Sequence, residues 1–321
     1  MKRVSFIIPV YNCERYLDTC LQSILRSGFS PEETEIVFVN DASTDHSWDT
    51  LNEIARQYAQ VKIVNQEKGG PATARNNGMK VSVGEYIWFV DADDRVVEGI
   101  ANSLLPYMDR RAEVVAFNYR KVFADHNEDV GNYTQENTVT GIGYLEKAYH
   151  GLYLWDKVFR RAFISECFID NTYHIEDFYF DYVNIISLKS VICLPVIGYE
   201  YVQANTDSIS KRRDQESVRK ANEDAYVVYS KLAKKRITVS DERERALLNL
   251  VLRHGLTGHL FTMMNEAPAN QVSLYIEKYR QVGLYPVQKT DEWRKNLFLL
   301  VANRKYLLLS LVVIKRILYK I

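Results

Sequence analysis

Three carboxylates follow directly after an apolar run near residue 90. Asp91, Asp93 and Asp94 come after the buried-strand pattern of residues 86–90. Open α/β sheets present their ligand sites at the carboxyl ends of such strands. Paired carboxylates there suit a hard divalent cation, which commonly accompanies a nucleotide diphosphate. Acidic residues are also common in turns and helix caps, so a metal site and a capping turn are both open on these residues alone.

Further candidate residues lie at the ends of the first three predicted strands and in the turns that follow them. They are Pro9, Tyr11, Asn12, Asp41, Ser43, Lys68, Gly70 and Arg75. Because the carboxyl ends of parallel strands meet at one edge of a sheet, we expect a single crevice there. An aromatic ring, a hydrogen-bonding carboxylate, a glycine turn, an arginine and an acid pair together fit a nucleotide. No GxGxxG motif follows the first strand, which argues against a dinucleotide cofactor.

The elements that must position these residues alternate between strand and helix. Predicted strands cover residues 4–10, 35–40, 61–64 and 86–90. Apolar residues at helical spacing lie between them, and Pro71 opens a further helix, where its missing N–H costs nothing. This alternation predicts parallel strands joined by right-handed crossovers.

The pattern changes after residue 110. Further strands are predicted at 113–119, 155–159 and 199–202, with a polar loop at 125–137 and a helix at 175–188. From about Asp214 the pattern is of long helices. The predicted fold class is therefore α/β: a mostly parallel sheet flanked by helices, followed by a helical C-terminal region.

Composition sets wide limits on function. The chain has 321 residues, is 47% apolar and 26% charged, and carries no net charge. This describes a globular protein and does not suggest nucleic-acid binding. Its four scattered cysteines predict reduced thiols. Without a signal-peptide pattern or a run of about 20 apolar residues, a cytoplasmic location is expected.

Four segments together resemble the family-2 glycosyltransferases. They are residues 4–12, 40–45, 70–76 and 91–94, in the order and at the spacing of that family. Residues 155–161, 174–180 and 205–210 resemble elements of its capsule and surface-polysaccharide members. The resemblance implies a GT-A-type, Rossmann-like catalytic domain over residues 1–212. Its nucleotide-binding half would be 1–110, its acceptor-side half 111–212, and a helical region would follow at 213–321.

The resemblance also implies a role for each matching residue. Tyr11 would border the base and Asp41 would read its edge. The implied donor-nucleotide residues are Pro9, Tyr11, Asn12, Asp41, Ser43, Lys68, Gly70, Arg75, Asp91 and Ala92. Asp93, together with Asp91, would ligate Mn²⁺ or Mg²⁺.

The later segments imply the acceptor side of the reaction. Asp177 would be the general base, with Glu176 beside it, and Trp155 and Lys157 would face the acceptor or the donor sugar. A sugar hydroxyl becomes a good nucleophile when a carboxylate takes its proton. Other interpretations are open, because Asp177 could cap a helix, and Trp155 and Lys157 could be a core aromatic residue and a solvated charge.

The implied activity is that of an inverting glycosyltransferase. It would move a hexosyl or N-acetylhexosaminyl group from a nucleoside-diphosphate sugar, with UDP favoured, to a saccharide or lipid-linked acceptor in capsular, exopolysaccharide or lipopolysaccharide assembly. One alternative is an inactive nucleotide-sugar-binding scaffold, against which the intact Asp91, Asp93 and Asp177 argue. A nucleotidyltransferase would need a Gly/Arg/Lys-rich loop after the first strand, and residues 11–14 are not one.

The C-terminal tail mixes basic and apolar residues. From residue 291 onward seven Lys and Arg residues face two acids, in a segment rich in Leu and Val. Such a pattern favours a helix lying in an anionic membrane interface. The alternative is a helix packed on the catalytic domain with its basic side chains extended to solvent. A peripheral position on the cytoplasmic face of a membrane is therefore expected.

Overall fold

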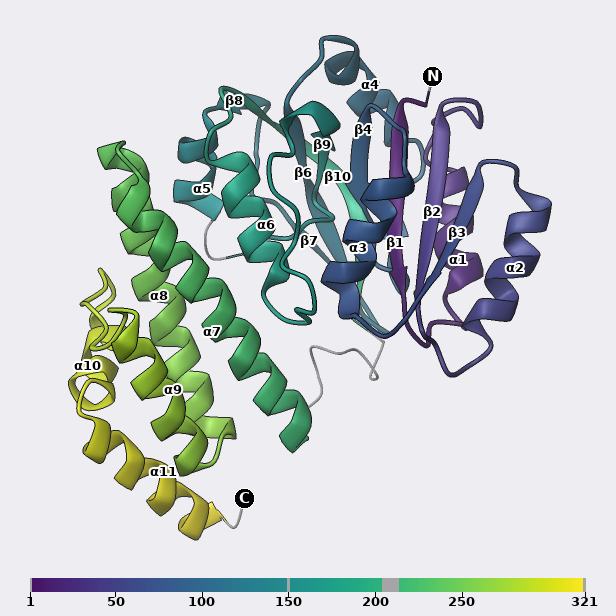
Figure 1. Ribbon diagram of the computed structural model, residues 1–321. Helices are drawn as coiled ribbons and strands as arrows, with labels where there is room; N and C mark the ends of the chain where they lie inside the picture. The colour runs from purple at the N-terminus through teal and green to yellow at the C-terminus, as the bar shows by residue number, and fades with distance from the viewer. Residues whose placement is uncertain (1, 149–150, 204–213, 320–321) are drawn as a thin grey trace. The chain divides into compact units, whose positions relative to one another are not determined.

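The computed structural model describes residues 2–148, 151–203 and 214–319 (Figure 1). Two compact units divide the chain. The sheet unit comprises Met1–Thr172 and Glu176–Thr206, and the helical unit comprises Tyr173–Ile175 and Asp207–Ile321. The predicted boundary after residue 212 and the polar turn at 205–210 lie outside the described residues.

A ten-stranded sheet forms the centre of the sheet unit. Its strands are β1 (Val4–Val10), β2 (Thr34–Asp41), β3 (Val61–Gln66), β4 (Tyr86–Phe89), β5 (Arg95–Val96), β6 (Val114–Val122), β7 (Asn127–Val130), β8 (Asn137–Val139), β9 (Lys157–Arg160) and β10 (Val191–Val202). The main order is β3-β2-β1-β4-β9-β6-β10-β5. The strands β3, β2, β1 and β4 are parallel, as predicted, whereas β9 runs antiparallel to β4 and β6.

Helices cover both faces of this sheet (Figure 1). They are α1 (Leu17–Leu25), α2 (Ser47–Gln57), α3 (Gly70–Val81), α4 (Ala101–Asp109), α5 (Gly141–Ala148) and α6 (Glu176–Ile185). Alternating residues of β1 point to opposite faces, so Phe6 packs in the core shared with α1 while Ile7 faces α3. A Cβ on Gly78 would lie 2.5 Å from Ile7, so this glycine allows α3 to lie close to the sheet.

Two predictions on the middle of the chain need correction. Residues 125–137, predicted as a polar loop, contain β7 and lead into β8. Both faces of β7 are largely exposed, so its sequence lacks the apolar alternation that marks a half-buried strand. The strand predicted at 199–202 extends back to Val191. Pro195 interrupted its pattern, and the register with β6 shifts between Leu194 and Ile197.

The helical unit contains the predicted long helices. They are α7 (Gln215–Thr238), α8 (Glu242–Glu266), α9 (Ala269–Gln281), α10 (Trp293–Ala302) and α11 (Lys305–Tyr319). Asp214 caps α7 by accepting hydrogen bonds from the amides of Glu216 and Ser217. No single helix in the described part of the chain is long and apolar enough to cross a bilayer. Residues Trp293–Ala302 and Lys305–Lys315, bent by 95°, meet that criterion together.

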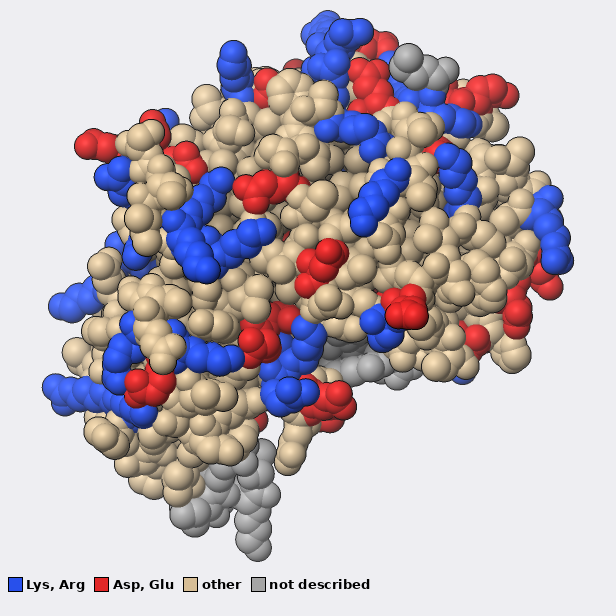
Figure 2. Space-filling model, viewed as in Figure 1, with Lys and Arg blue, Asp and Glu red and all other residues tan. Residues whose placement is uncertain are grey.

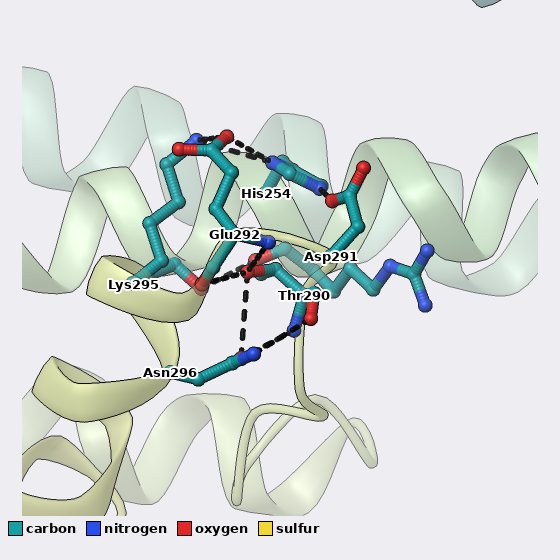
Figure 3. A network of polar contacts seen from close by, with 8 residues as sticks. His254, Thr290, Asp291, Glu292, Lys295 and Asn296 are labelled. Carbon is teal, nitrogen blue, oxygen red and sulfur yellow. Dashed lines mark hydrogen bonds and ion pairs between the residues drawn. The ribbon is translucent and has the colours of Figure 1, made fainter.

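A polar network joins the start of α10 to α8 (Figure 3). The buried His254 contacts two side chains. Its Nε2 lies 2.5 Å from Asp291 Oδ1, and its Nδ1 lies 3.1 Å from Lys295 Nζ. The side chain of Asn296 accepts from the amide of Thr290 at 2.7 Å. The tail therefore packs within the helical unit, and its two acids already have partners.

Candidate active site

The carboxyl ends of β1, β2 and β4 meet at one edge of the sheet, as the parallel arrangement requires. The pairing of β1 with β4 ends at Ile7, and Pro9 lies two residues further along β1. The N–H that proline lacks is therefore not needed for pairing with β4. Asn12 has φ of +54°, a conformation that asparagine tolerates. Its amide donates to Ser43 Oγ at 3.1 Å, and its Oδ1 accepts from the amide of Thr44 at 2.8 Å. The first two strand ends are therefore held together.

Asp41 anchors the glycine turn that begins α3. Its carboxylate accepts from the amide of Gly69 at 2.6 Å and from that of Gly70 at 3.0 Å, and Gln66 donates to it at 2.8 Å. The side chain is only 4% exposed. A negative charge is favoured at a helix N-terminus, which explains this position. Carboxylate oxygens have further lone pairs, so base recognition by Asp41 stays a prediction.

Lys68 lies over the ring predicted to border the base. Its ammonium is 2.6 Å from the centroid of the Tyr11 ring, and it also approaches Asp41 at 3.6 Å. This is a cation–π contact. In this arrangement the lysine covers one face of the ring, so a base that stacks on Tyr11 would use the other face or displace Lys68.

Arg75 is the centre of the site. It extends from α3 and is buried, with a side chain that is 5% exposed. Its guanidinium donates to Asp91 at 2.9 Å, to Glu176 at 2.8 Å and to Asp177 at 3.3 Å. The carboxylates come from the end of β4 and from the first turn of α6. One cation therefore holds together the acid predicted to bind metal and the acid predicted to be the base.

Burial and charge act in opposite directions on this cluster. Burial raises the pKa of Asp177 well above its usual range, and Glu176 and Asp91 add to this, although Arg75 lowers it. Burial alone would lower the pKa of Arg75, but Asp177, Asp91 and Glu176 raise it further above its ordinary value. Asp177 keeps 25% of its side chain exposed. It is therefore an accessible carboxylate whose proton affinity is increased, as a general base requires.

The acidic run after β4 divides into two parts. Asp94 is buried, accepting from the Tyr199 hydroxyl at 2.9 Å and from the Val202 amide at 2.7 Å. Ala92 is also buried, whereas Asp91 and Asp93 are partly exposed. No group of three His, Cys, Asp or Glu side chains that could hold a metal was found among the described residues. Two carboxylates suffice for Mg²⁺ or Mn²⁺ when phosphate oxygens complete the shell, so Asp91 and Asp93 stay the predicted metal ligands.

The structure buries Trp155 and Lys157, and so corrects their prediction as sugar-facing residues. Lys157 has no exposed side-chain surface and donates to Asp181 at 2.8 Å, with Asp156 at 2.5 Å. Trp155 is 3% exposed and stacks on Tyr199 with ring centroids 4.6 Å apart. Lys157 is not the solvated charge of the alternative interpretation either. Through its ion pair with Asp181, Lys157 instead connects β9 to α6, the helix that carries Asp177.

Sequence reasoning missed two residues that support the site. Tyr199 accepts from the Asp91 amide at 3.0 Å, and thereby links the acid run to β10. Asn76 donates to the Phe168 carbonyl at 3.0 Å and to Asp170 at 2.8 Å, which ties the segment before α6 to α3. The sequence contains 22 tyrosines, and nothing in its local pattern separates Tyr199 from the others. Asn76 does directly follow Arg75 in a segment of the family resemblance.

Comparisons with known proteins agree with this geometry. The model of the family described as glycosyl transferase family 2 matches residues 5–168. EpsH of Bacillus subtilis is 26% identical over 293 residues, which cover 88% of this chain and 82% of EpsH. The poly(ribitol-phosphate) beta-glucosyltransferase of Bacillus spizizenii is 41% identical over 96 residues, but these cover 29% of this chain and 15% of that protein.

A solved structure shares the fold. Residues 1–349 of Staphylococcus aureus TarS, in complex with UDP-GlcNAc, superpose with a TM-score of 0.76 at 20% identity. The match covers 98% of this chain and 91% of that one. The predicted fold class is confirmed by this likeness.

Proposed function

The chain belongs to glycosyl transferase family 2, and from this premise we propose that it transfers a sugar from a UDP-sugar to a saccharide acceptor with inversion. The observation that carries the proposal is the position of Arg75. Its guanidinium brings Asp91 within 2.9 Å and Asp177 within 3.3 Å of one side chain. The acid proposed for the donor side and the acid proposed as the base therefore contact a single cation.

Asp177 is proposed as the general base. As the acceptor oxygen attacks the anomeric carbon, its proton passes to the Asp177 carboxylate. The bond between the anomeric carbon and the phosphate oxygen breaks at the same time, and UDP leaves with the electron pair. Arg75 keeps Asp177 and Glu176 in place and offsets their mutual repulsion. A single displacement of this kind inverts the anomeric centre.

Asp91 and Asp93 are proposed to hold Mn²⁺ or Mg²⁺ with the donor diphosphate. The ion supplies charge stabilisation for the departing diphosphate. Four residues at the ends of β1 and β2 would enclose the nucleoside: Tyr11, Asn12, Asp41 and Ser43. UDP is favoured because TarS, which has the same fold, is in complex with UDP-GlcNAc. A polymeric surface saccharide is the proposed acceptor, since the Bacillus spizizenii relative is named for another polymer that presents hydroxyl groups, poly(ribitol-phosphate).

A donor panel tests the proposal. Purified protein with Mn²⁺ is given UDP-glucose, UDP-galactose, UDP-GlcNAc, UDP-GalNAc, UDP-glucuronate and GDP-mannose, and nucleotide release is measured. We expect release from one UDP-sugar, its loss on chelation with EDTA, and its loss in Asp93→Ala. Asp129→Asn, an exposed acid on β7, is the control. Donor binding that never leads to turnover with any saccharide acceptor would instead favour an inactive scaffold.

We further propose that α10 and α11 rest on the cytoplasmic face of an anionic membrane. Trp293, Leu297 and Leu300 lie on one face of α10 and are each at least 58% exposed. On α11, Leu308 and Val312 are buried, while an opposite face is exposed. Among the side chains of α11 that the structure describes, the exposed large hydrophobic ones are Tyr306, Leu307, Leu311, Val313 and Ile314. Packed helices seldom expose such stripes without a further partner, and the exposed Arg294 and Arg304 favour anionic lipid.

A further inference from the structure

The sheet unit contains a pocket that is lined by none of the residues of the proposed donor site. It has a volume of about 520 Å³ and is lined by residues of β6, β8, α5 and β10 and of the segments that join them. Binding sites for small molecules commonly measure about 300–1,000 Å³. This pocket is therefore large enough to hold a sugar ring.

Aromatic and amide side chains line this pocket. Four tyrosines contribute: Tyr119, Tyr133, Tyr144 and Tyr153. Gln135 and Lys147 lie at its exposed edge, and neither Asp nor Glu is among the described lining residues. Tyrosine rings offer flat apolar faces with a hydroxyl at one end, and amides both donate and accept. This combination suits a polyhydroxylated ring, and the one lysine favours a neutral or anionic ligand.

A row of stacked rings joins this pocket to the candidate active site. Tyr153 in the pocket wall stacks on Trp155 at 4.6 Å, and Trp155 stacks on Tyr199, also at 4.6 Å. The hydroxyl of Tyr199 accepts from the Asp91 amide at 3.0 Å. Two buried side chains, Trp155 and Tyr199, therefore lie between the pocket wall and the acid run.

We propose that this pocket binds a sugar of the acceptor saccharide other than the one that reacts. The inference rests on the proposed function, because it names where the rest of that acceptor lies. Contacts to remote parts of a substrate position its reacting group. A growing polysaccharide offers such remote sugars, whereas a single monosaccharide does not. The pocket thus selects for acceptors longer than one sugar.

Saccharide binding measured without donor tests this inference. The wild-type protein is applied to an array of cello-, chito- and hyaluronan-type oligosaccharides, and bound species are titrated in solution. The test variant is Gln135→Ala/Lys147→Ala. The control is Gln57→Ala/Lys189→Ala, which removes the same two side-chain types from other exposed positions of the sheet unit. UDP-GlcNAc binding is titrated for every protein.

We expect at least one oligosaccharide to bind, and its affinity to fall about 10-fold or more in the test variant, as two lost hydrogen bonds would require. The control and all UDP-GlcNAc affinities should stay unchanged. Saccharide binding that is equal in both variants, or absent in a protein that binds UDP-GlcNAc, would overturn the inference. Absence of nucleotide-sugar binding, with saccharide binding still dependent on the pocket, would count against the proposed function and leave the pocket assignment standing.

Discussion

At the scale of single residues, Arg75 decides what the acids around it can do. Without a cation between them, three carboxylates gathered around one point would repel one another, and one would take up a proton. The guanidinium donates to each of them, at distances from 2.8 to 3.3 Å. Its planar, multi-donor group is suited to such a cluster, and an ammonium group would not replace it.

Replacing Asp177 with Asn should separate donor binding from transfer. The amide keeps the shape of the side chain but cannot accept the hydroxyl proton, so transfer should fall by about 10²–10⁴-fold. UDP-sugar affinity should change little, because Asp91, and not Asp177, belongs to the proposed donor site. Steady-state transfer and donor titration are measured on the same preparations, with Asp129→Asn as the control. Near-normal turnover in Asp177→Asn would exclude this residue as the base.

The pH profile should report the raised pKa of Asp177. A general base works only when deprotonated, so activity should fall as the pH drops through its pKa. Burial raises that pKa above the usual value of about 3.9, so the acidic limb of kcat/KM should lie at a higher pH than an ordinary aspartate would give. An acidic limb at or below pH ~4 would contradict the assignment.

At the scale of elements, the buried Lys157 explains how α6 is held. Asp177 and Asp181 lie one turn apart on that helix, and Lys157 of β9 pairs with Asp181 at 2.8 Å. Burial raises the pKa of Asp181 to about 7, even though Lys157 lowers it. Lys157 with its two acids therefore forms a structural link between β9 and the helix that presents the base.

Lys157→Met should strongly destabilise the sheet unit. It leaves Asp156 and Asp181 buried without a counter-charge, for which a loss of about 3–5 kcal/mol is expected. The matched control is Arg95→Met, which removes a partly exposed pair with Glu200 and should cost about 1 kcal/mol or less. Denaturant unfolding, followed by the fluorescence of the buried Trp88 and Trp155, measures both. Equal losses in the two variants would show that the buried pair is not a structural link.

In α8, His259 should make the helical unit sensitive to acid. Its ring lies between Tyr229 and Tyr279, and burial lowers its pKa to about 4. Because the unfolded value is about 6.5, the unfolded chain binds the proton first. This contribution is complete above pH ~6.5 and is lost as the pH falls toward 4.

His259→Gln should therefore flatten the dependence of the melting temperature on pH between 7 and 4.5, as followed by circular dichroism. His46→Gln serves as the control, because His46 is exposed on the sheet unit. If the two variants lose stability in parallel with the wild-type protein, His259 is not the group responsible.

At the scale of the whole molecule, charge and apolar surface are distributed differently. Basic and acidic side chains are interspersed on the face that Figure 2 shows, in keeping with a net charge of zero. Most of the exposed large apolar side chains among the described residues, by contrast, lie on α10 and α11. A nonpolar stripe flanked by arginines is the arrangement that inserts into a membrane interface.

Leu300→Glu/Leu311→Glu should reduce binding to anionic liposomes at least 10-fold, with nucleotide-sugar binding unchanged. Both side chains are exposed, at 58% and 38%, so the fold should tolerate the change. Deletion of residues 291–321 is less informative, because it would also remove the buried Leu299 and Leu308. Liposome flotation at low and high salt is the measurement, with the exposed Val83→Glu as control. Flotation equal to that of the wild-type protein would refute the membrane proposal.

The sequence by itself determined the parallel half of the sheet, the helices between its strands and the polar residues at its carboxyl edge. Continuous apolar runs and helical spacing are local signals, so they can be read without the fold. The family resemblance predicted a role for Asp177 in the same way, from neighbouring residues. The fold class and the family are confirmed, whereas the roles of the individual site residues stay predictions.

Tertiary structure alone decided which polar residues meet. Arg75 and Glu176 are separated by 101 positions, yet their side chains form a bond of 2.8 Å. Lys157 has the same charge as a solvent-exposed lysine, and only the packing of β9 under α6 reveals it as buried. The sequence does not distinguish Asp94 from Asp91 and Asp93. Only the structure shows that Asp94 is buried and accepts a hydrogen bond from Tyr199. The physical reason is that burial and pairing depend on neighbours brought together by folding, which no local pattern of one chain contains.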